Sequence, residues 1–192
     1  WLIVMGVEST EDVDALAEDC HAGRVPSRAQ LIGGVPTIFD PTQAPPGCHT
    51  AFWWQLAPYS LKEGPQHWDQ IRDDVCRRGM ELIREFSPNI NQDTIEDWHG
   101  TSPLDIERHL PNMRHGDWMC GELSQDQFLD KRPFPECSRY ATPIPGLYLA
   151  GSCCHPGGNI TGAPGYNAAN VIARDQGVDR WWKPHDLEQL WS

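Results

Sequence analysis

Several sequence features that would directly indicate a class of protein are missing from the 192 residues of this chain. The longest hydrophobic run, residues 1–7, is far shorter than the roughly 20 residues of a membrane-spanning helix. That run also lacks the basic flank and cleavage site of a signal peptide. No cluster of Lys or Arg offsets the formal charge of −12. We therefore expect no transmembrane segment, and neither nucleic acid nor an anionic membrane as a partner.

The cysteines form neither a paired set nor a zinc motif. Seven is an odd number in a chain of this size, which argues against the disulfide framework of a secreted protein. Cys20, Cys48 and Cys154 are each followed directly by His, a spacing that does not aim two ligands at one zinc ion. We predict structural thiols, no metal site and a reducing, cytoplasmic compartment.

The chain does contain apolar strands alternating with amphipathic helices. Hydrophobic residues make up 39% of the sequence and nine are Trp, so the chain has the material for a folded core. The patterns predict strands over 1–7, 29–39 and 49–57 and helices over 10–20, 65–86 and 102–109. The composition of residues 111–140 indicates a long ordered loop. The expected fold class is α/β, an α+β arrangement with a mixed sheet.

The segment over residues 141–177 carries the clearest chemical signal. A short apolar strand, Leu147–Ala150, ends at Gly151, and a glycine-rich turn leads into an Ala-rich helix from about Gly162 to Asp175. Such a unit brings bare backbone close to a ligand and presents helix N–H groups to it, which suits a phosphate, a ribityl chain or a flavin edge. A tight connection without any ligand would use glycines too, so composition leaves both interpretations open.

A longer string around this turn, IPGLYLAGSCCHPGGNITGAPGYNAANVIARD, resembles the C-terminal FAD-closing motif of the phytoene desaturase family. Within that family it is most similar to the branch related to the pyridine nucleotide-disulfide oxidoreductase domain-containing protein 2 group. The blocks DPTQAPPGCHT, SPLDIERHLPNMRHGD and DQFLDKRPFP fit the same branch. The resemblance therefore extends over nearly the whole chain.

The resemblance implies FAD as the cofactor and assigns backbone positions to it. Gly151 and Ser152 are implied to lie beside the pyrophosphate and the ribityl chain. Four further positions, implied to line the flavin, are Asn159, Ile160, Thr161 and Gly162. The helix that follows would stabilise negative charge on the reduced flavin through its N-terminus.

The resemblance also divides the chain by role. Residues 1–140 are implied to be part of the substrate domain, 141–180 to close the FAD site, and 181–192 to form a C-terminal tail. The whole would be the C-terminal part of a two-domain FAD-dependent oxidoreductase fold.

The GxGxxG unit that opens this family is missing, because Gly33-Gly34 is followed by neither a third glycine nor a capped helix. The chain also begins with Trp1 inside an apparent strand. We therefore expect a fragment or one subunit, inactive alone, with a second polypeptide segment carrying GxGxxG.

The expected activity is oxidation of a small organic, partly apolar substrate by hydride transfer to flavin. Two alternatives remain open: a non-catalytic subunit that docks onto a flavoprotein, and a scaffold protein that lost its cofactor.

Catalytic residues are harder to assign from the pattern. His115 and His155 are the candidates, with a structural role as the alternative for each. Cys153-Cys154 could be a redox pair, but adjacent cysteines make a strained ring, and apolar packing is the favoured interpretation. The aromatic run Phe52–Trp54 could line a substrate pocket, although core packing is the favoured role.

Overall fold

The computed structural model describes residues 2–158 and 161–183 of the chain. It divides into two compact units, Trp1–Gly116 and Asp117–Ser192. Each unit is a separate body and is described by itself. The predicted boundary at residue 140 divides the chain by role and stays a prediction.

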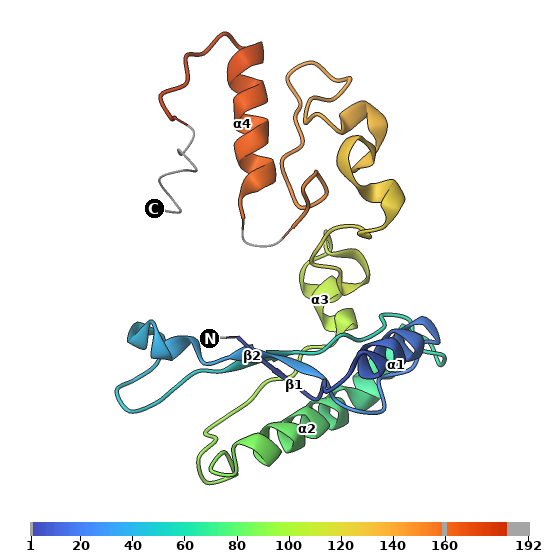
Figure 1. The fold of residues 1–192 in the computed structure, drawn as a ribbon, viewed down its shortest axis with the longest axis vertical. Helices are drawn as coiled ribbons and strands as arrows, with labels where there is room; N and C mark the ends of the chain where they lie inside the picture. Colours follow the sequence, from blue (N-terminus) through green and yellow to red (C-terminus); the bar gives the residue numbers. More distant parts are fainter. Residues whose placement is uncertain (1, 159–160, 184–192) are drawn as a thin grey trace. The chain divides into compact units, whose positions relative to one another are not determined.

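The first unit is built on a small sheet of three strands, β1 (Ile3–Met5), β2 (Leu31–Gly34) and β3 (Phe52–Trp54) (Figure 1). Both strand pairs are antiparallel, so the prediction of a mixed sheet is wrong for the described residues. The reason is topological, because each strand pairs with the next one along the chain. The strands are also shorter than predicted: β2 ends before Pro36, which begins a 3-10 turn.

The three helices of this unit confirm the predicted ones. In α1 (Thr10–His21), Ser9 and Asp12 form a capping box, and α3 (Pro103–His109) begins with the same device at Ser102. The predicted helix over 65–86 is a 3-10 turn followed by α2 (Trp68–Phe86). Within the part of the chain that the structure describes, no helix is both long and apolar enough to cross a membrane.

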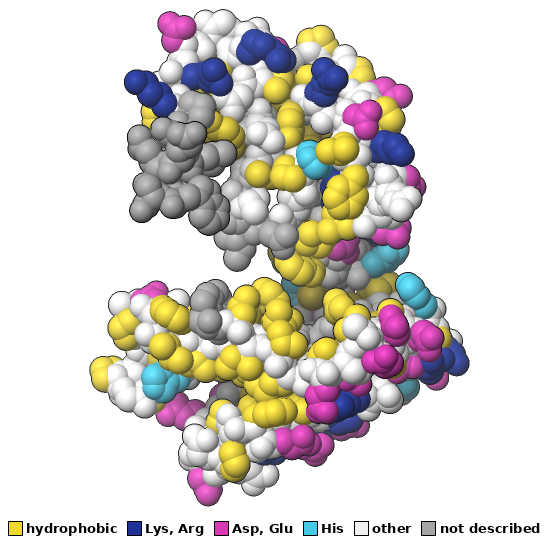
Figure 2. Space-filling view, in the orientation of Figure 1, with side chains coloured by type: hydrophobic (Ala, Val, Ile, Leu, Met, Phe, Trp, Pro, Cys, Tyr) yellow, Lys and Arg dark blue, Asp and Glu magenta, His cyan; other side chains and the backbone are white. Residues whose placement is uncertain are grey.

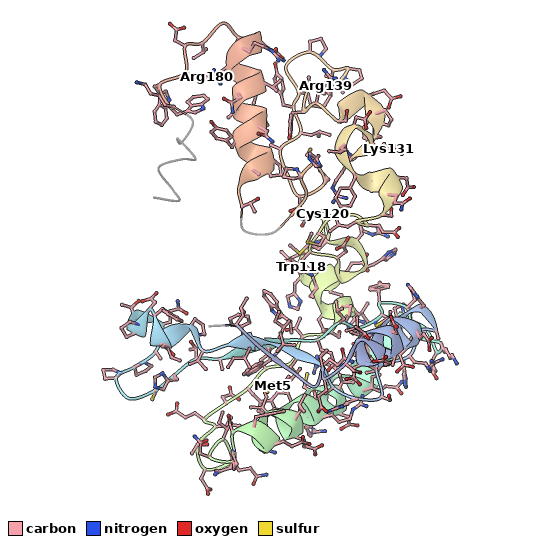
Figure 3. All side chains as sticks on the ribbon, viewed as in Figure 1. Met5, Trp118, Cys120, Lys131, Arg139 and Arg180 are labelled. Carbon is pink, nitrogen blue, oxygen red and sulfur yellow. The ribbon has the colours of Figure 1, made fainter. Side chains whose placement is uncertain are left out.

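One face of the sheet packs on α2 and forms the core of the unit. Met5 and Leu31 from the sheet contact Leu82 and Ile83 from α2, and Trp53 packs against this cluster (Figure 3). The structure therefore supports core packing for Trp53, the middle residue of the aromatic run.

The opposite face of the sheet is apolar and open. Val4, Ile32 and Trp54 are register partners in one row across the three strands. Their exposed fractions are 59%, 38% and 51%, which is high for large hydrophobic side chains. Figure 2 shows hydrophobic side chains gathered over the sheet. Since side chains alternate across a strand, this row lies on the side away from α2.

The second unit is a series of turns packed beside α4 (Ala163–Asp175), which confirms the helix predicted from about Gly162. The predicted strand Leu147–Ala150 is not formed; among the described residues it contributes one isolated bridge, Ala141 to Tyr148. Its backbone hydrogen bonds to the segment around Tyr140: the Leu149 N–H donates to the Tyr140 carbonyl at 2.8 Å, and the Thr142 N–H donates to the Leu147 carbonyl at 3.2 Å. The predicted long loop contains only 3-10 turns and no strand or long helix among its described residues.

Candidate functional site

The glycine-rich turn is held by its own backbone. The Cys154 N–H donates to the Gly151 carbonyl at 2.9 Å, and the Gly157 N–H donates to the Cys154 carbonyl at 2.7 Å. A Cβ added to Gly158 would lie 3.1 Å from Met119 Sδ, a tight contact that packing within the protein explains without a ligand. The alternative of a tight connection without a ligand therefore explains part of the glycine pattern.

Gly151 is not explained in this way. Its φ is not positive, and the nearest atom to an added Cβ would be Cys153 Sγ at 3.9 Å, an ordinary contact distance. The described residues thus leave room for a side chain at this position. Bare backbone at an open surface is what a closely approaching ligand needs.

The helix α4 starts where it was predicted, but its first turn presents fewer free N–H groups than expected. Thr161 Oγ1 accepts the Ala163 N–H at 3.2 Å, and Pro164 has no N–H. The Tyr166 N–H donates to the carbonyl of Gly162, the left-handed N-cap. Within the described ranges, Gly165 is therefore the only early helix residue whose N–H has no acceptor. The predicted ligand positions Asn159 and Ile160 lie outside the described residues.

Tyr140 joins the turn to the helix. Its hydroxyl donates to the His155 carbonyl at 2.7 Å and accepts a hydrogen bond from Asn167 Nδ2 of α4 at 2.8 Å. The backbone of Tyr140 has φ +73°, a conformation that costs a non-glycine residue free energy and persists only where surrounding contacts impose it. The sequence pattern singled out neither Tyr140 nor Asn167, because a bridge of this kind exists only in the tertiary structure.

Arg132 lies behind the turn and is 1% exposed. Its guanidinium donates to the Ser152 carbonyl at 2.9 Å, to the Met119 carbonyl at 3.0 Å and to the Glu122 carbonyl at 2.8 Å. Its Nε is buried and has no hydrogen-bond partner among the described residues. Sequence reasoning missed this residue too, since the burial of an Arg in a loop leaves no local pattern.

The two candidate histidines belong to different units. His155 Nδ1 accepts the Leu129 N–H at 3.3 Å, so the neutral ring carries its proton on Nε2. The ring lines an open groove of about 470 Å³ together with Tyr140, Arg139 and Arg174. His115 lies in the first unit, its ring 4.8 Å from that of Tyr59. A catalytic role for either histidine stays a prediction.

The adjacent cysteines behave as packed thiols. Cys153 and Cys154 are both free, with their sulfur atoms 3.9 Å apart. Cys154 is fully buried, and this burial, with the neighbouring Cys153 thiol, raises its pKa to about 11. A thiol that keeps its proton at neutral pH is a poor nucleophile and redox group. The structure therefore supports apolar packing over a redox pair.

Together these residues fit the cofactor that the sequence implies. Gly151 offers open backbone, α4 has no acidic residue in its first turn, and the buried Nε of Arg132 lacks an acceptor among the described residues. All three features favour a polar or negatively charged ligand at the turn. The chemistry of the donor set therefore suits the phosphate and ribityl portion of FAD.

Comparison with known proteins gives relatives for almost the whole chain, although no family model matches it. Over 177 residues it is 36% identical to the pyridine nucleotide-disulfide oxidoreductase domain-containing protein 2 of Mus musculus, which covers 90% of this chain. Over 192 residues it is 33% identical to a limonene dehydrogenase subunit of Castellaniella defragrans, which covers 97%. A phytoene desaturase (neurosporene-forming) of Cereibacter sphaeroides is 24% identical over 139 residues.

The matched part is a minor share of each relative. The chain covers 30% of the mouse protein, 34% of the limonene dehydrogenase subunit and 25% of the phytoene desaturase. It thus spans about a third of these relatives' length or less.

Proposed function

The chain is a relative of the phytoene desaturase-like, FAD-type oxidoreductases, and we propose that it is the C-terminal part of an FAD-dependent member. In this proposal the turn around Gly151 and Ser152 and the start of α4 close the FAD site. Thr161 and Gly162 line the flavin, as do Asn159 and Ile160. A second polypeptide segment, with GxGxxG, holds the remainder of the cofactor.

The observation that carries the proposal is the joint made by Tyr140. One hydroxyl group fixes both the His155 carbonyl of the glycine-rich turn and Asn167 of α4. Two backbone segments that could each meet a cofactor are thereby held in one arrangement before any ligand binds. Preorganisation of this kind reduces the ordering cost of binding.

The residues of the chain have separate roles in this proposal. When bound, FAD supplies the acceptor for a hydride from an organic substrate. Gly151 admits the cofactor to the backbone, and the positive end of α4 favours negative charge near the ring. His155 holds a proton on Nε2 at the open groove, where it can serve as a donor. The apolar row Val4, Ile32 and Trp54 of the first unit suits an apolar partner segment.

FAD titration tests the division of the site between two segments. The chain alone should bind FAD weakly, because it supplies the turn and helix contacts without a GxGxxG unit. Adding the polypeptide that carries GxGxxG should produce tight, stoichiometric binding, followed by quenching of flavin fluorescence. Submicromolar binding by the isolated chain would contradict the proposed division.

A second candidate function is a non-catalytic subunit that docks onto a flavoprotein. The name of the Castellaniella defragrans relative favours it, since that name describes one subunit of a limonene dehydrogenase. The two candidates differ in where the flavin lies. Substitution of Gly151 lowers the flavin content of the assembly if the cofactor lies at this turn, and leaves it unchanged if the chain only docks.

A further inference from the structure

A buried cation lies behind the candidate site, and no carboxylate among the described residues lies within ion-pair distance of it. Arg132 is 1% exposed and forms no ion pair with any described carboxylate. Its hydrogen-bond acceptors are all backbone carbonyl oxygens, from Met119, Gly121, Glu122 and Ser152. A buried charge without a counter-ion is costly, and buried Arg side chains are ordinarily paired.

The surrounding groups form no ion pair with Arg132: the carboxylate of Asp117, in the same loop, accepts the Met119 and Gly121 N–H groups instead. The thiols of Cys120 and Cys154 lie near the guanidinium, and burial raises the pKa of both, so they stay neutral at pH 7. Cys120 lies in the same loop as the carbonyls that Arg132 contacts (Figure 3). The Nε of Arg132 has no acceptor among the described residues either. The charge is therefore not neutralised by an ion pair among the described residues, and it can act only through the backbone of the turn, because the guanidinium is buried.

Holding the loop in place does not by itself require a positive charge. A neutral side chain with two N–H donors, such as Gln, could bind two of the same carbonyl oxygens. Arg adds a full charge directly behind Ser152, on the turn proposed to meet the cofactor. Through a medium of effective dielectric constant about 20, a unit charge acts over several ångströms with a strength that changes affinity roughly tenfold to a hundredfold.

We propose that Arg132 is the positioning residue of an anion site, and that its positive charge is completed by the diphosphate of the bound dinucleotide cofactor. The inference rests on the proposed function and deepens it by giving Arg132, which no sequence motif singled out, a role toward the diphosphate that the resemblance places beside Gly151 and Ser152. Arg132 acts in two ways: it fixes the Ser152 carbonyl, and it attracts the phosphate groups through the turn. It therefore discriminates FAD from a flavin without phosphates.

The test compares two substitutions that both keep hydrogen-bond donors. Arg132→Lys retains the charge, whereas Arg132→Gln removes it. For the wild-type assembly and both variants, affinity is measured for FAD, for riboflavin, which lacks phosphates, and for inorganic pyrophosphate. We expect Arg132→Gln to lower FAD affinity at least tenfold and to leave riboflavin affinity within about twofold, because only the phosphates meet the charge.

Arg132→Lys provides the control for structural damage. It should retain most of the preference for FAD over riboflavin, even if affinity for both falls. Binding of pyrophosphate alone should follow the same order as binding of FAD. If Arg132→Gln lowers FAD and riboflavin affinity equally, or lowers neither, Arg132 only shapes the loop and the inference is wrong.

The wild-type protein gives a test that needs no variant. Equal affinities for FAD and riboflavin in the wild type overturn the inference even if both variants misfold, and leave the proposed function intact. Failure of the complete wild-type assembly to bind either flavin overturns both.

Discussion

The hydroxyl of Tyr140 is the single group whose removal most directly separates the glycine-rich turn from α4. Tyr140→Phe deletes the bonds to the His155 carbonyl and from Asn167 and leaves a part-buried acceptor unsatisfied. We expect the free energy of unfolding to fall by about 1–2 kcal/mol, measured by urea denaturation. Tyr148→Phe is the control, because that hydroxyl makes a long, exposed contact of 3.4 Å with Asp175. Equal losses in the two variants would contradict the proposed joint.

Asp105 gives a pH-dependent prediction at the same scale. Burial alone would raise its pKa, but hydrogen bonds from Ser102 and Arg72 outweigh burial and hold the pKa below its ordinary value of 3.8. A carboxyl group whose pKa is lower in the folded than in the unfolded state stabilises the fold at pH values above its unfolded-state pKa. This contribution is lost as the pH falls through the folded-state pKa. The first unit should therefore lose stability as acid is added below about pH 4.

Asp105→Asn should remove that acid-dependent step and lower stability at pH 7, because the capping box of α3 and the pair with Arg72 lose their charge. Asp74→Asn is the matched control, since the Asp74–Arg77 pair is exposed on α2. Urea denaturation at a series of pH values measures both. If the free energy of unfolding of Asp105→Asn falls at low pH as much as that of the wild type, carboxylates other than Asp105 cause the loss of stability in acid.

At the scale of elements, helices were predictable because their signals are local. Ser9 and Ser102 indicate their caps in the sequence, and the apolar period of α2 continues along the whole helix. Strands were less predictable than helices. Leu147–Ala150 has the composition of a strand, but among the described residues it forms only one isolated bridge, between Tyr148 and Ala141. Strand formation depends on partners that a local pattern does not contain.

The same distinction applies within the site. The glycine-rich turn and its helix were visible in the sequence, as local motifs are. Arg132 and Tyr140 were not, because their importance comes from burial and from contacts with residues 20 and 27 positions away. The start of α4 also has fewer free N–H groups than expected, because the Ala163 N–H donates to Thr161 and Pro164 has no N–H.

The turn–helix element yields a prediction for cofactor retention. Gly151→Ala adds a methyl group where the described structure has room, so the fold should be unchanged. If FAD approaches this backbone, flavin retained by the assembly should fall by about tenfold, equivalent to about 1.4 kcal/mol. Gly79→Ala in α2 is the control, with an added Cβ 3.5 Å from Leu31. Flavin content from absorbance and helix content from circular dichroism distinguish the two effects.

Gly151 is a cleaner position for this test than Gly162. Gly162 also lies at the proposed site, but its φ of +64° would strain any β-branched replacement. A loss of flavin in Gly162→Val would therefore mix helix distortion with obstruction of the ligand. Equal flavin content in wild type and Gly151→Ala would contradict the proposed position of the cofactor.

At the scale of the whole molecule, the open sheet face predicts assembly. Val4, Ile32 and Trp54 form an exposed apolar row, and the relatives are about three times longer than this chain. We expect the isolated chain to bind a hydrophobic dye and to associate, because a contiguous apolar patch on a sheet is seldom left uncovered. A monodisperse monomer of 21.7 kDa that binds no dye would contradict this expectation.

A matched pair of variants localises the association. Val4→Lys places a charge in the apolar row, whereas Phe86→Lys places one at the end of α2, and the two original side chains have similar exposed fractions of 59% and 60%. Val4→Lys should reduce dye binding and association, and Phe86→Lys should leave both nearly unchanged. Light scattering with dye fluorescence measures the pair.

The absorbance spectrum of the natively purified assembly that contains this chain tests the central claim most directly. The account predicts absorbance bands at about 370 and about 450 nm, as for any protein-bound oxidised flavin. Their intensity should correspond to about one flavin per chain. The flavin should remain with the wild-type assembly through purification. The flavin content of the Gly151→Ala assembly should be lower. A complete, folded assembly with no flavin absorbance would contradict the account.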